Sequence, residues 1–274
     1  MASTYDTRLG ATIQAPPVVA ELQSVFANLD DAPLLAALIG PTRRGPKGHP
    51  VKALWCCFVA KSVLGLPSTV SMIRTLHNNP FIAEACGIPS PDAIPHEATF
   101  SRFFARLSTY NMAAKVKDVS RSLVRRHYAS LPGFGERVAF DSTTLQAWSN
   151  PSKKGKKPKK IATRGYKARV GMVSDSDAGW SVKKGTKGVK EATFGYKMHL
   201  LIDCEYELPI AAHVSVGNVH DVTRASNLFR EARTANDLFR PNYAMGDAGY
   251  SSQELARLLR LQYGATPIID PNPK

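Results

Sequence analysis

Apolar residues in roughly the first 130 positions recur every three or four residues, which is the spacing of an amphipathic helix. The run from Val51 to Leu64 is apolar on most sides, as in a buried helix, and Gly65-Leu66-Pro67 ends it. Ser68 or Thr69 is the expected cap of the next helix, and Thr99 is a candidate cap further on. A basic helix from about Tyr110 to Ala129 completes the region. The helical spacing is carried by Leu22, Val25, Phe26, Leu29, Val70, Ile73, Leu76, Phe100, Phe103, Phe104 and Leu107.

Short apolar runs separated by turn residues begin at Arg137 and predict strands. The predicted strands are Val138–Phe140 ending at Asp141, Met198–Ile202 ending at Asp203, Pro209–Val216, Tyr243–Met245 and Thr266–Ile269. The short link 205–208 makes the second and third strands a hairpin. Helices are expected over Val222–Ala235 and after the capping-box pattern Ser251-Ser252-Gln253-Glu254. The pattern therefore predicts a mixed α+β chain, with an all-helical N-terminal domain followed by a β-sheet flanked by helices.

The net charge of the chain limits the classes of partner that we expect it to bind. Lys and Arg number 36 against 22 Asp and Glu, a formal net charge of +14, which favours nucleic acid or an acidic membrane face. The membrane alternative is disfavoured because Lys61 interrupts the most apolar run, Ala53–Ala60, whereas a spanning helix needs about 20 apolar residues. The N-terminus has no secretory signal pattern, and the four cysteines form no Cys-x2-Cys pair. We expect a cytoplasmic protein with reduced cysteines.

Residues 153–169 form a basic cluster that contains no acidic residue. Glycine and proline interleave with its charges, which favours a mobile loop over a helix. Each phosphate neutralised by such a cluster releases counterions, so we expect DNA contact that weakens with salt and is largely independent of base sequence. A merely solvated loop is the alternative. Its basic residues are Lys153, Lys154, Lys156, Lys157, Lys159, Lys160, Arg164, Lys167 and Arg169.

Two aspartates come directly after predicted strands. Asp141 follows Val138-Ala139-Phe140 and precedes Ser142-Thr143-Thr144, and Asp247 lies between Gly246 and Gly249. Carboxylates at adjacent strand ends bind hard divalent cations through oxygen, and two such ions support phosphodiester chemistry. The alternative is that either aspartate is only a turn or cap residue. Spacing alone leaves both interpretations open.

Several motifs in a fixed order connect the chain with a known family. They are Val138-Ala139-Phe140-Asp141-Ser142-Thr143, Phe194-Gly195-Tyr196-Lys197-Met198-His199, Gly217-Asn218-Val219-His220-Asp221, Met245-Gly246-Asp247-Ala248-Gly249-Tyr250 and Ile268-Ile269-Asp270-Pro271-Asn272-Pro273. This order resembles the catalytic core of DDE-type insertion-sequence transposases, members of the RNase H-like superfamily. The helical part resembles the N-terminal domain of that family in Gly48-His49-Pro50, Leu64-Gly65-Leu66 and Ala98-Thr99-Phe100-Ser101-Arg102-Phe103.

The resemblance implies that Asp141 and Asp247 are catalytic ligands of a two-metal site for Mg²⁺ or Mn²⁺. The third acidic ligand of the family is a glutamate on a helix after the fifth strand, and the chain ends at Lys274 before such a helix. Glu254 is a poor substitute, because it lies on the preceding helix and belongs to the capping-box pattern. The expectation is therefore a triad that is incomplete within this chain.

Other candidate residues lie beside these motifs. Lys197 begins a predicted strand and is a candidate phosphate contact or a solvated strand end. His220 and Asp221 are candidate neighbours of the active site, with a helix N-cap as the alternative for Asp221. Arg102 and Arg106 lie four residues apart and are candidates for reading a major groove, with a plain structural helix as the alternative.

Together these expectations describe a DNA transposase of a prokaryotic insertion sequence that hydrolyses and rejoins phosphodiester bonds at element ends. Residues 1–132 would form the DNA-binding helical domain, and residues 133–274 an RNase H-like core with a basic insertion at about 145–192. The expected partners are double-stranded DNA, both terminal inverted repeats and target, and further copies of the chain; the expected location is the nucleoid. The alternative is a catalytically incomplete remnant that occupies DNA as a competitor or repressor.

Overall fold

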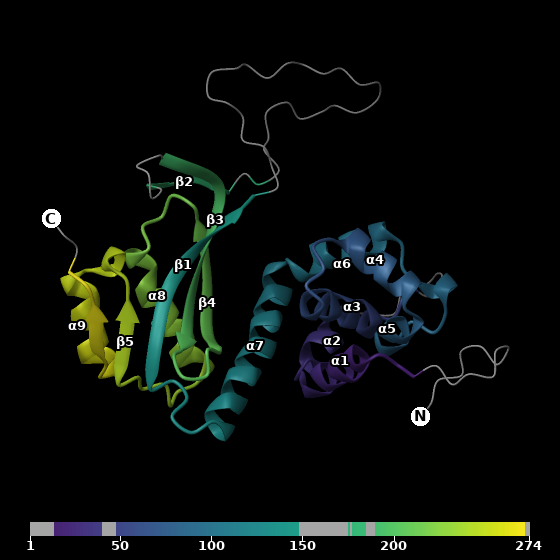
Figure 1. Ribbon diagram of the computed structural model, residues 1–274, viewed down its shortest axis with the longest axis horizontal. Helices are drawn as coiled ribbons and strands as arrows, with labels where there is room; N and C mark the ends of the chain where they lie inside the picture. Colours follow the sequence, from purple (N-terminus) through teal and green to yellow (C-terminus); the bar gives the residue numbers. More distant parts are fainter. Residues whose placement is uncertain (1–13, 40–47, 148–174, 176, 185–189, 272–274) are drawn as a thin grey trace, which may run out of the picture. The chain divides into compact units, whose positions relative to one another are not determined.

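The computed structural model describes residues 14–39, 48–147, 175, 177–184 and 190–271 (Figure 1). The chain divides into two compact units, residues 1–123 and 124–274, and each unit has an apolar core of its own. Among the described residues, no helix has the length and the apolar character that crossing a membrane requires.

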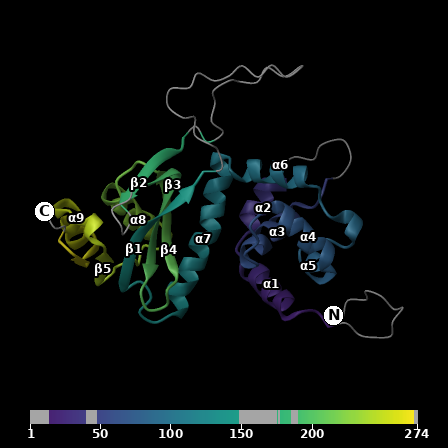
Figure 2. The same cartoon turned by 45° about the horizontal axis from the view of Figure 1, so that its top comes forward.

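The first unit is built from helices around one apolar core (Figure 2). The helices are α1 (Pro17–Asn28), α2 (Ala32–Ile39), α3 (Val51–Val63), α4 (Thr69–Asn78), α5 (Pro80–Ala85), α6 (Glu97–Leu107) and the first part of α7 (Tyr110–Ser130), with a short 3₁₀ turn at Pro91–Ala93. Leu22, Trp55 and Phe100 are among the buried core side chains. The free thiols of Cys56, Cys57 and Cys86 are buried in the same core, so they act there as apolar side chains.

The helix caps show where local patterns succeed and where they mislead. Ser68 caps α4 as expected, since its side chain accepts from the Ser71 amide while the Ser71 hydroxyl accepts from the Ser68 amide. The expected cap at Thr99 is wrong, because α6 begins two residues earlier and the Nδ1 atom of His96 accepts from the Ala98 amide at 3.2 Å. Histidine is not a usual capping residue, so the pattern gave no signal for it.

The second unit is a mixed six-stranded sheet with helices. Its elements are β1 (Arg137–Gln146), β2 (Gly179–Lys184), β3 (Lys190–Asp203), β4 (Pro209–Val216), α8 (Val222–Ala235), β5 (Tyr243–Gly246), a 3₁₀ turn η2 (Ala248–Tyr250), α9 (Gln253–Tyr263) and β6 (Thr266–Ile269). β3 is antiparallel to β1, β2 and β4, whereas β5 is parallel to β1 and β6. This arrangement confirms the predicted mixed fold, with β1 between β3 and β5 (Figure 2).

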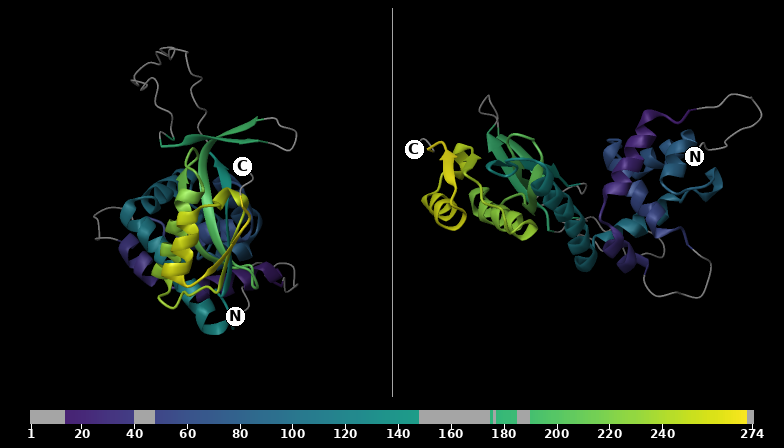
Figure 3. Two further views of the ribbon diagram at one scale, coloured as in Figure 1. Left: turned by 90° about the vertical axis from the view of Figure 1, so that its left-hand side faces the viewer. Right: turned by 90° about the horizontal axis from the view of Figure 1, so that it is seen from below.

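One face of this sheet is covered by α8 and α9, which lie on the same side of it (Figure 3, right). Val138 and Phe140 of β1 are buried, and the Phe140 ring meets Phe229 of α8 with centroids 5.5 Å apart. Successive residues of a strand point to opposite faces. Asp141 and Thr143, on the alternate positions of β1, are exposed. The alternation therefore buries the apolar side of β1 and exposes its polar side to solvent.

The largest differences from the predicted strands concern β1, β2 and β3. Asp141 lies inside β1 rather than at its end, because β1 continues to pair with β3 as far as Gln146 opposite Gly195. That extension carries polar and exposed residues, which a search for apolar runs overlooks. The predicted basic loop at about 145–192 contains β2, which pairs with the first part of β3, and β3 begins at Lys190 rather than near Met198. Lys197 is consequently an interior residue of β3.

Candidate active site

Asp141 lies on β1, and Asp247 directly follows β5, the parallel neighbour of β1. The register of β1 and β5 pairs Phe140 with Gly246, so Asp141 is the next residue of β1 and Asp247 is the first residue after β5. The backbone of Asp247 is still extended, with φ −73° and ψ 173°. Because neighbouring strands run about 4.8 Å apart and opposite residues share a face, both carboxylates emerge on the same side of the sheet. The structure thus brings together the two aspartates singled out in the sequence.

Gly246 permits this close approach. A Cβ atom at residue 246 would stand 2.7 Å from the Phe140 ring, closer than packed side chains tolerate. β5 therefore fits against Phe140 only with glycine here, and the position of Asp247 depends on it.

Backbone amides orient both carboxylates. Oδ1 of Asp141 accepts from the Ser142 amide at 2.6 Å, and Oδ1 of Asp247 accepts from the Gly249 amide at 3.0 Å. Both side chains are exposed. Among the residues that the structure describes, no hydrogen-bond partner is present for the second oxygen of either carboxylate. Each aspartate therefore keeps an oxygen available for a ligand.

Tyr250 is a buried residue that lies among carboxylates. Its ring packs against Phe140 with centroids 4.9 Å apart, and its side chain is 1% exposed. Burial raises the pKa of Tyr250, and the negative charges of Asp221, Asp141 and Asp247 raise it further, while the nearby Ser142 hydroxyl lowers it. No atom of the described residues meets the geometry of a hydrogen bond to the Tyr250 hydroxyl. The buried Tyr250 hydroxyl therefore has the Ser142 hydroxyl near it and lies within the electrostatic reach of three aspartates.

Lys197 and Asp221 form an ion pair on the face of the sheet that α8 covers. Nζ of Lys197 donates to Oδ1 of Asp221 and to the carbonyl oxygen of Val219, both at 3.0 Å. The side chains of Lys197 and Asp221 are 12% and 29% exposed. Asp221 occupies the N-cap position of α8, as the alternative for this residue expects, but its side chain makes no capping hydrogen bond and pairs with Lys197 instead. The pairing corrects the interpretation of Lys197 as a solvated strand end.

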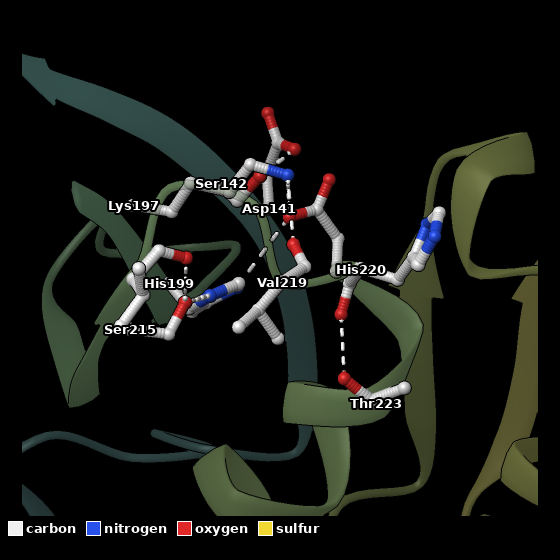
Figure 4. A network of polar contacts seen from close by, with 10 residues as sticks. Asp141, Ser142, Lys197, His199, Ser215, Val219, His220 and Thr223 are labelled. Carbon is white, nitrogen blue, oxygen red and sulfur yellow. Dashed lines mark hydrogen bonds and ion pairs between the residues drawn. The ribbon is translucent and has the colours of Figure 1, made fainter. Parts of the chain in front are cut away.

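His199 extends this polar network beneath the ion pair (Figure 4). Its side chain is fully buried, with Nε2 2.8 Å from the Ser215 hydroxyl and Nδ1 4.0 Å from Oδ1 of Asp221. Burial lowers the pKa of His199, an effect that the charge of Asp221 partly opposes. The residue is therefore a neutral imidazole at neutral pH.

His220 is adjacent in sequence but is not part of this network. Its side chain is exposed, and its carbonyl oxygen accepts from the Thr223 hydroxyl at 2.7 Å. Figure 4 shows the His220 ring directed away from Lys197 and His199.

The expected DNA contacts lie elsewhere in the chain. Arg102 and Arg106 are exposed on α6, while Phe103 and Leu107 of the same helix are buried. The nine basic residues of the 153–169 cluster lie outside the described residues.

The donor set at Asp141 and Asp247 fits a hard divalent cation. Mg²⁺ is commonly held by one or two carboxylates, with water and substrate phosphate completing its ligands. In the part of the chain that the structure describes, no three Asp, Glu, His or Cys side chains converge as a metal site. The two strand aspartates are therefore an open carboxylate pair and not a closed metal cage.

The sequence pattern assigned no role to Tyr250, Ser142 or His199, although each lies within one of the family motifs. The available signal was period two along β3: Lys197 and His199 are alternate residues and share a face. Ser142 pairs with His199 across β1 and β3, so it shares that face as well. The burial of His199 required the covering helix.

Comparison with known families matches both parts of the chain. Residues 132–274, more than half of the chain, match the family described as "Transposase DDE domain". Residues 14–106 match the family described as "Transposase domain (DUF772)". The search of curated proteins finds no match. With its strand aspartates, mixed sheet and these two matches in order, the chain belongs to the DDE-type transposases of insertion sequences.

Proposed function

We propose that this chain cleaves and rejoins DNA phosphodiester bonds, using divalent cations held by Asp141 and Asp247. The observation that carries the proposal is the neighbouring placement of these two residues, Asp141 on β1 and Asp247 directly after β5, inside the segment that matches the DDE domain. A bound Mg²⁺ or Mn²⁺ supplies activation of a water or hydroxyl nucleophile and charge stabilisation at the phosphate.

The chain's own residues orient the site. The Ser142 and Gly249 amides each hold one oxygen of an aspartate, which leaves the other oxygen available for a ligand. Preorganised carboxylates need little rearrangement when a ligand arrives. The Phe140 ring packs against Tyr250, and this contact joins the residue before Asp141 to the turn after Asp247.

We further propose a division of labour between residues 1–132 and residues 133–274. The helical part would recognise double-stranded DNA, with Arg102 and Arg106 on an exposed helix face, and the second part would carry out the chemistry. The basic residues 153–169 would contact phosphates without regard to base sequence. Pairing of two element ends would need more than one copy of the chain, acting on nucleoid DNA in the cytoplasm.

The test is Mn²⁺-dependent cleavage of DNA from the flanks of the protein's own gene. We expect Asp141→Asn and Asp247→Asn to lower cleavage at least about a hundredfold. Removing a direct metal ligand should cost at least as much activity as removing a residue that hydrogen-bonds to such a ligand. DNA affinity should stay nearly unchanged. Asp237→Asn, an exposed aspartate between α8 and β5, is the matched control. Undiminished cleavage by Asp141→Asn would remove this residue from the mechanism. DNA binding without cleavage by the unaltered chain would instead favour the competitor or repressor role.

A further inference from the structure

β4 is an edge strand whose outer side is unpaired in the part of the chain that the structure describes. It pairs there only with β3, in an antiparallel register that sets Val214 opposite Met198. Ala212 and Val214 are both exposed. The outer side of an edge strand presents backbone N–H and C=O groups to which another strand can bind. The ladder between β3 and β4 shows which residues carry these groups.

The hydrogen bonds to β3 identify the outward residues of β4. The Gly217 amide donates to the Gly195 carbonyl oxygen at 3.0 Å, so these two residues form a hydrogen-bonded pair. Opposite residues of an antiparallel ladder alternate between hydrogen-bonded and non-hydrogen-bonded pairs. Ser215 therefore bonds to β3, whereas the N–H and C=O groups of Ala212 and Val214 point outward. Among the described residues, no other backbone group bonds to them.

The other edge strands of this sheet are protected against pairing, and β4 is not. Proteins commonly protect free edges with charged residues, with proline or by keeping the strand very short. β2 ends with Lys183-Lys184, and β6 has four residues that include Pro267. Residues 210–216 of β4 include no Lys, Arg, Asp, Glu or Pro. β4 is therefore the edge of this sheet that is open to a further strand.

A hollow beside β4 contains charges of both signs. Its volume is about 370 Å³, and Val214, Asp177 and Arg224 are among its lining residues. Asp177 accepts a hydrogen bond from the Tyr196 hydroxyl at 2.7 Å. Arg224 makes no ion pair among the described residues, and its Nε atom is buried without a hydrogen bond. Two copies of this surface are complementary in charge, because each offers an acid and an unpaired base.

We propose that β4 is an interface between two copies of the chain, and that the two β4 strands pair antiparallel across a two-fold axis. Ala212 of each copy then lies opposite Val214 of the other, and every outward group of both residues is paired. The pairing ends where the edge closes, because Pro209 has no N–H and the Val216 carbonyl oxygen already accepts from the Val219 amide at 3.1 Å. A two-fold axis requires the same surface on both copies, which antiparallel self-pairing provides.

The charge of the chain favours this place for self-association. The formal net charge is +14, so two copies repel each other over much of their surface. Residues 210–216 contain no charged side chain, apart from any proton on His213, and meet their own copy without that repulsion. The inference deepens the proposed function, which needs more than one copy of the chain, and it rests on that part alone.

The experiment is sedimentation velocity of the full chain over a range of concentrations. Val214→Pro removes an outward N–H and no bond to β3, so it should weaken self-association about tenfold or more. Val214→Lys keeps the N–H but places like charges near the axis, and it should weaken association as well. Val182→Lys on β2 adds the same charge at a similarly exposed valine, 59% against 55%, and should leave association unchanged.

Hydrogen exchange tests the same contact in the unaltered chain. The amides of Ala212 and Val214 should exchange slowly at high protein concentration and rapidly after dilution. The amides of His213 and Ser215 bond to β3, so they should remain protected at both concentrations and serve as internal controls. These measurements and Val214→Lys decide the question if Val214→Pro does not fold.

The outcomes separate the interface from the function that it would serve. Unchanged association in a folded Val214→Pro, or equal weakening by Val182→Lys, would refute the β4 interface and leave a function that uses several copies intact. Slow exchange of the Ala212 and Val214 amides in a monomeric chain would also overturn it, because the edge would then be covered within one copy. A chain that stays monomeric at every concentration, with and without DNA, would refute both proposals.

Discussion

The ring of Tyr250 packs edge-on against Phe140, with centroids 4.9 Å apart and an interplanar angle of 80°. Phe140 immediately precedes Asp141, and Tyr250 is three residues beyond Asp247. One aromatic contact therefore joins the two segments that carry the candidate ligands. The two candidate ligands are therefore attached to the apolar core of the second unit.

Replacing Tyr250 with phenylalanine tests whether its hydroxyl lacks a partner. Deleting a buried donor that makes no hydrogen bond removes a desolvation cost, so Tyr250→Phe should leave the free energy of unfolding unchanged or raise it by about 1 kcal/mol. Tyr206→Phe is the comparison, since the Tyr206 hydroxyl donates to the Pro132 carbonyl at 2.9 Å and its removal should cost about 1 kcal/mol. Urea unfolding measures both. A clear loss in Tyr250→Phe would show that its hydroxyl is hydrogen-bonded.

Gly246→Ala should damage both stability and the site. The added Cβ would meet the Phe140 ring at 2.7 Å, and overpacking of this kind costs about 1–3 kcal/mol. The displaced β5 would carry Asp247 with it, so Mn²⁺ binding should weaken in the same variant. Gly48→Ala, where nothing lies within 4 Å, is the control for a general effect of alanine. Equal stability of the two variants would contradict the close packing of β5 on Phe140.

His199 should make the second unit less stable in mild acid. Its pKa is lowered from 6.5 by burial, so the unfolded chain takes up the proton first as the pH falls. The stability of the folded state is then full above about pH 6.5 and declines below it, by at most about 1.4 kcal/mol per pH unit for one proton. The charged or titratable groups that act on His199 are Asp221, which raises its pKa, and His213, Lys197 and Arg224, which lower it.

The measurement is the free energy of unfolding between pH 5 and 8. His199→Gln should remove part of the decline below pH 6.5, and His220→Gln, at an exposed position, should retain it. The same pH dependence in His199→Gln and in the unaltered protein would exclude His199 as its source.

The basic cluster should govern the salt dependence of DNA binding. Changing Lys153, Lys154, Lys156 and Lys157 to glutamine should reduce the slope of log affinity against log salt by about 0.9 for each phosphate that is no longer neutralised. Arg102→Ala should instead change the preference among DNA sequences, because contacts to base edges carry specificity. Both effects are measurable by fluorescence anisotropy on duplexes of matched length. An unchanged slope in the lysine variant would mean that this cluster does not bind phosphate.

Local patterns determined much of the fold. The boundaries of α8 and of the strands β4 and β6 follow directly from apolar spacing and turn residues. Such signals lie within a few neighbouring residues, so each can be interpreted without knowing the rest of the molecule. The apolar pattern did not predict β2 or the polar half of β1, because their place in the sheet comes from pairing with β3. That pairing joins segments that are distant in the sequence.

The sequence by itself also determined that Asp141 and Asp247 are candidate ligands, through short strands, small neighbours and the resemblance to a family. Only the tertiary structure decided that β1 and β5 are adjacent and parallel, which places the two carboxylates side by side. It also decided the roles around them: Lys197 pairs with Asp221, His199 is buried, and His220 is exposed. These outcomes depend on which face of the sheet α8 covers. Burial and charge pairing arise from the packing of whole elements, and no short stretch of sequence encodes them alone.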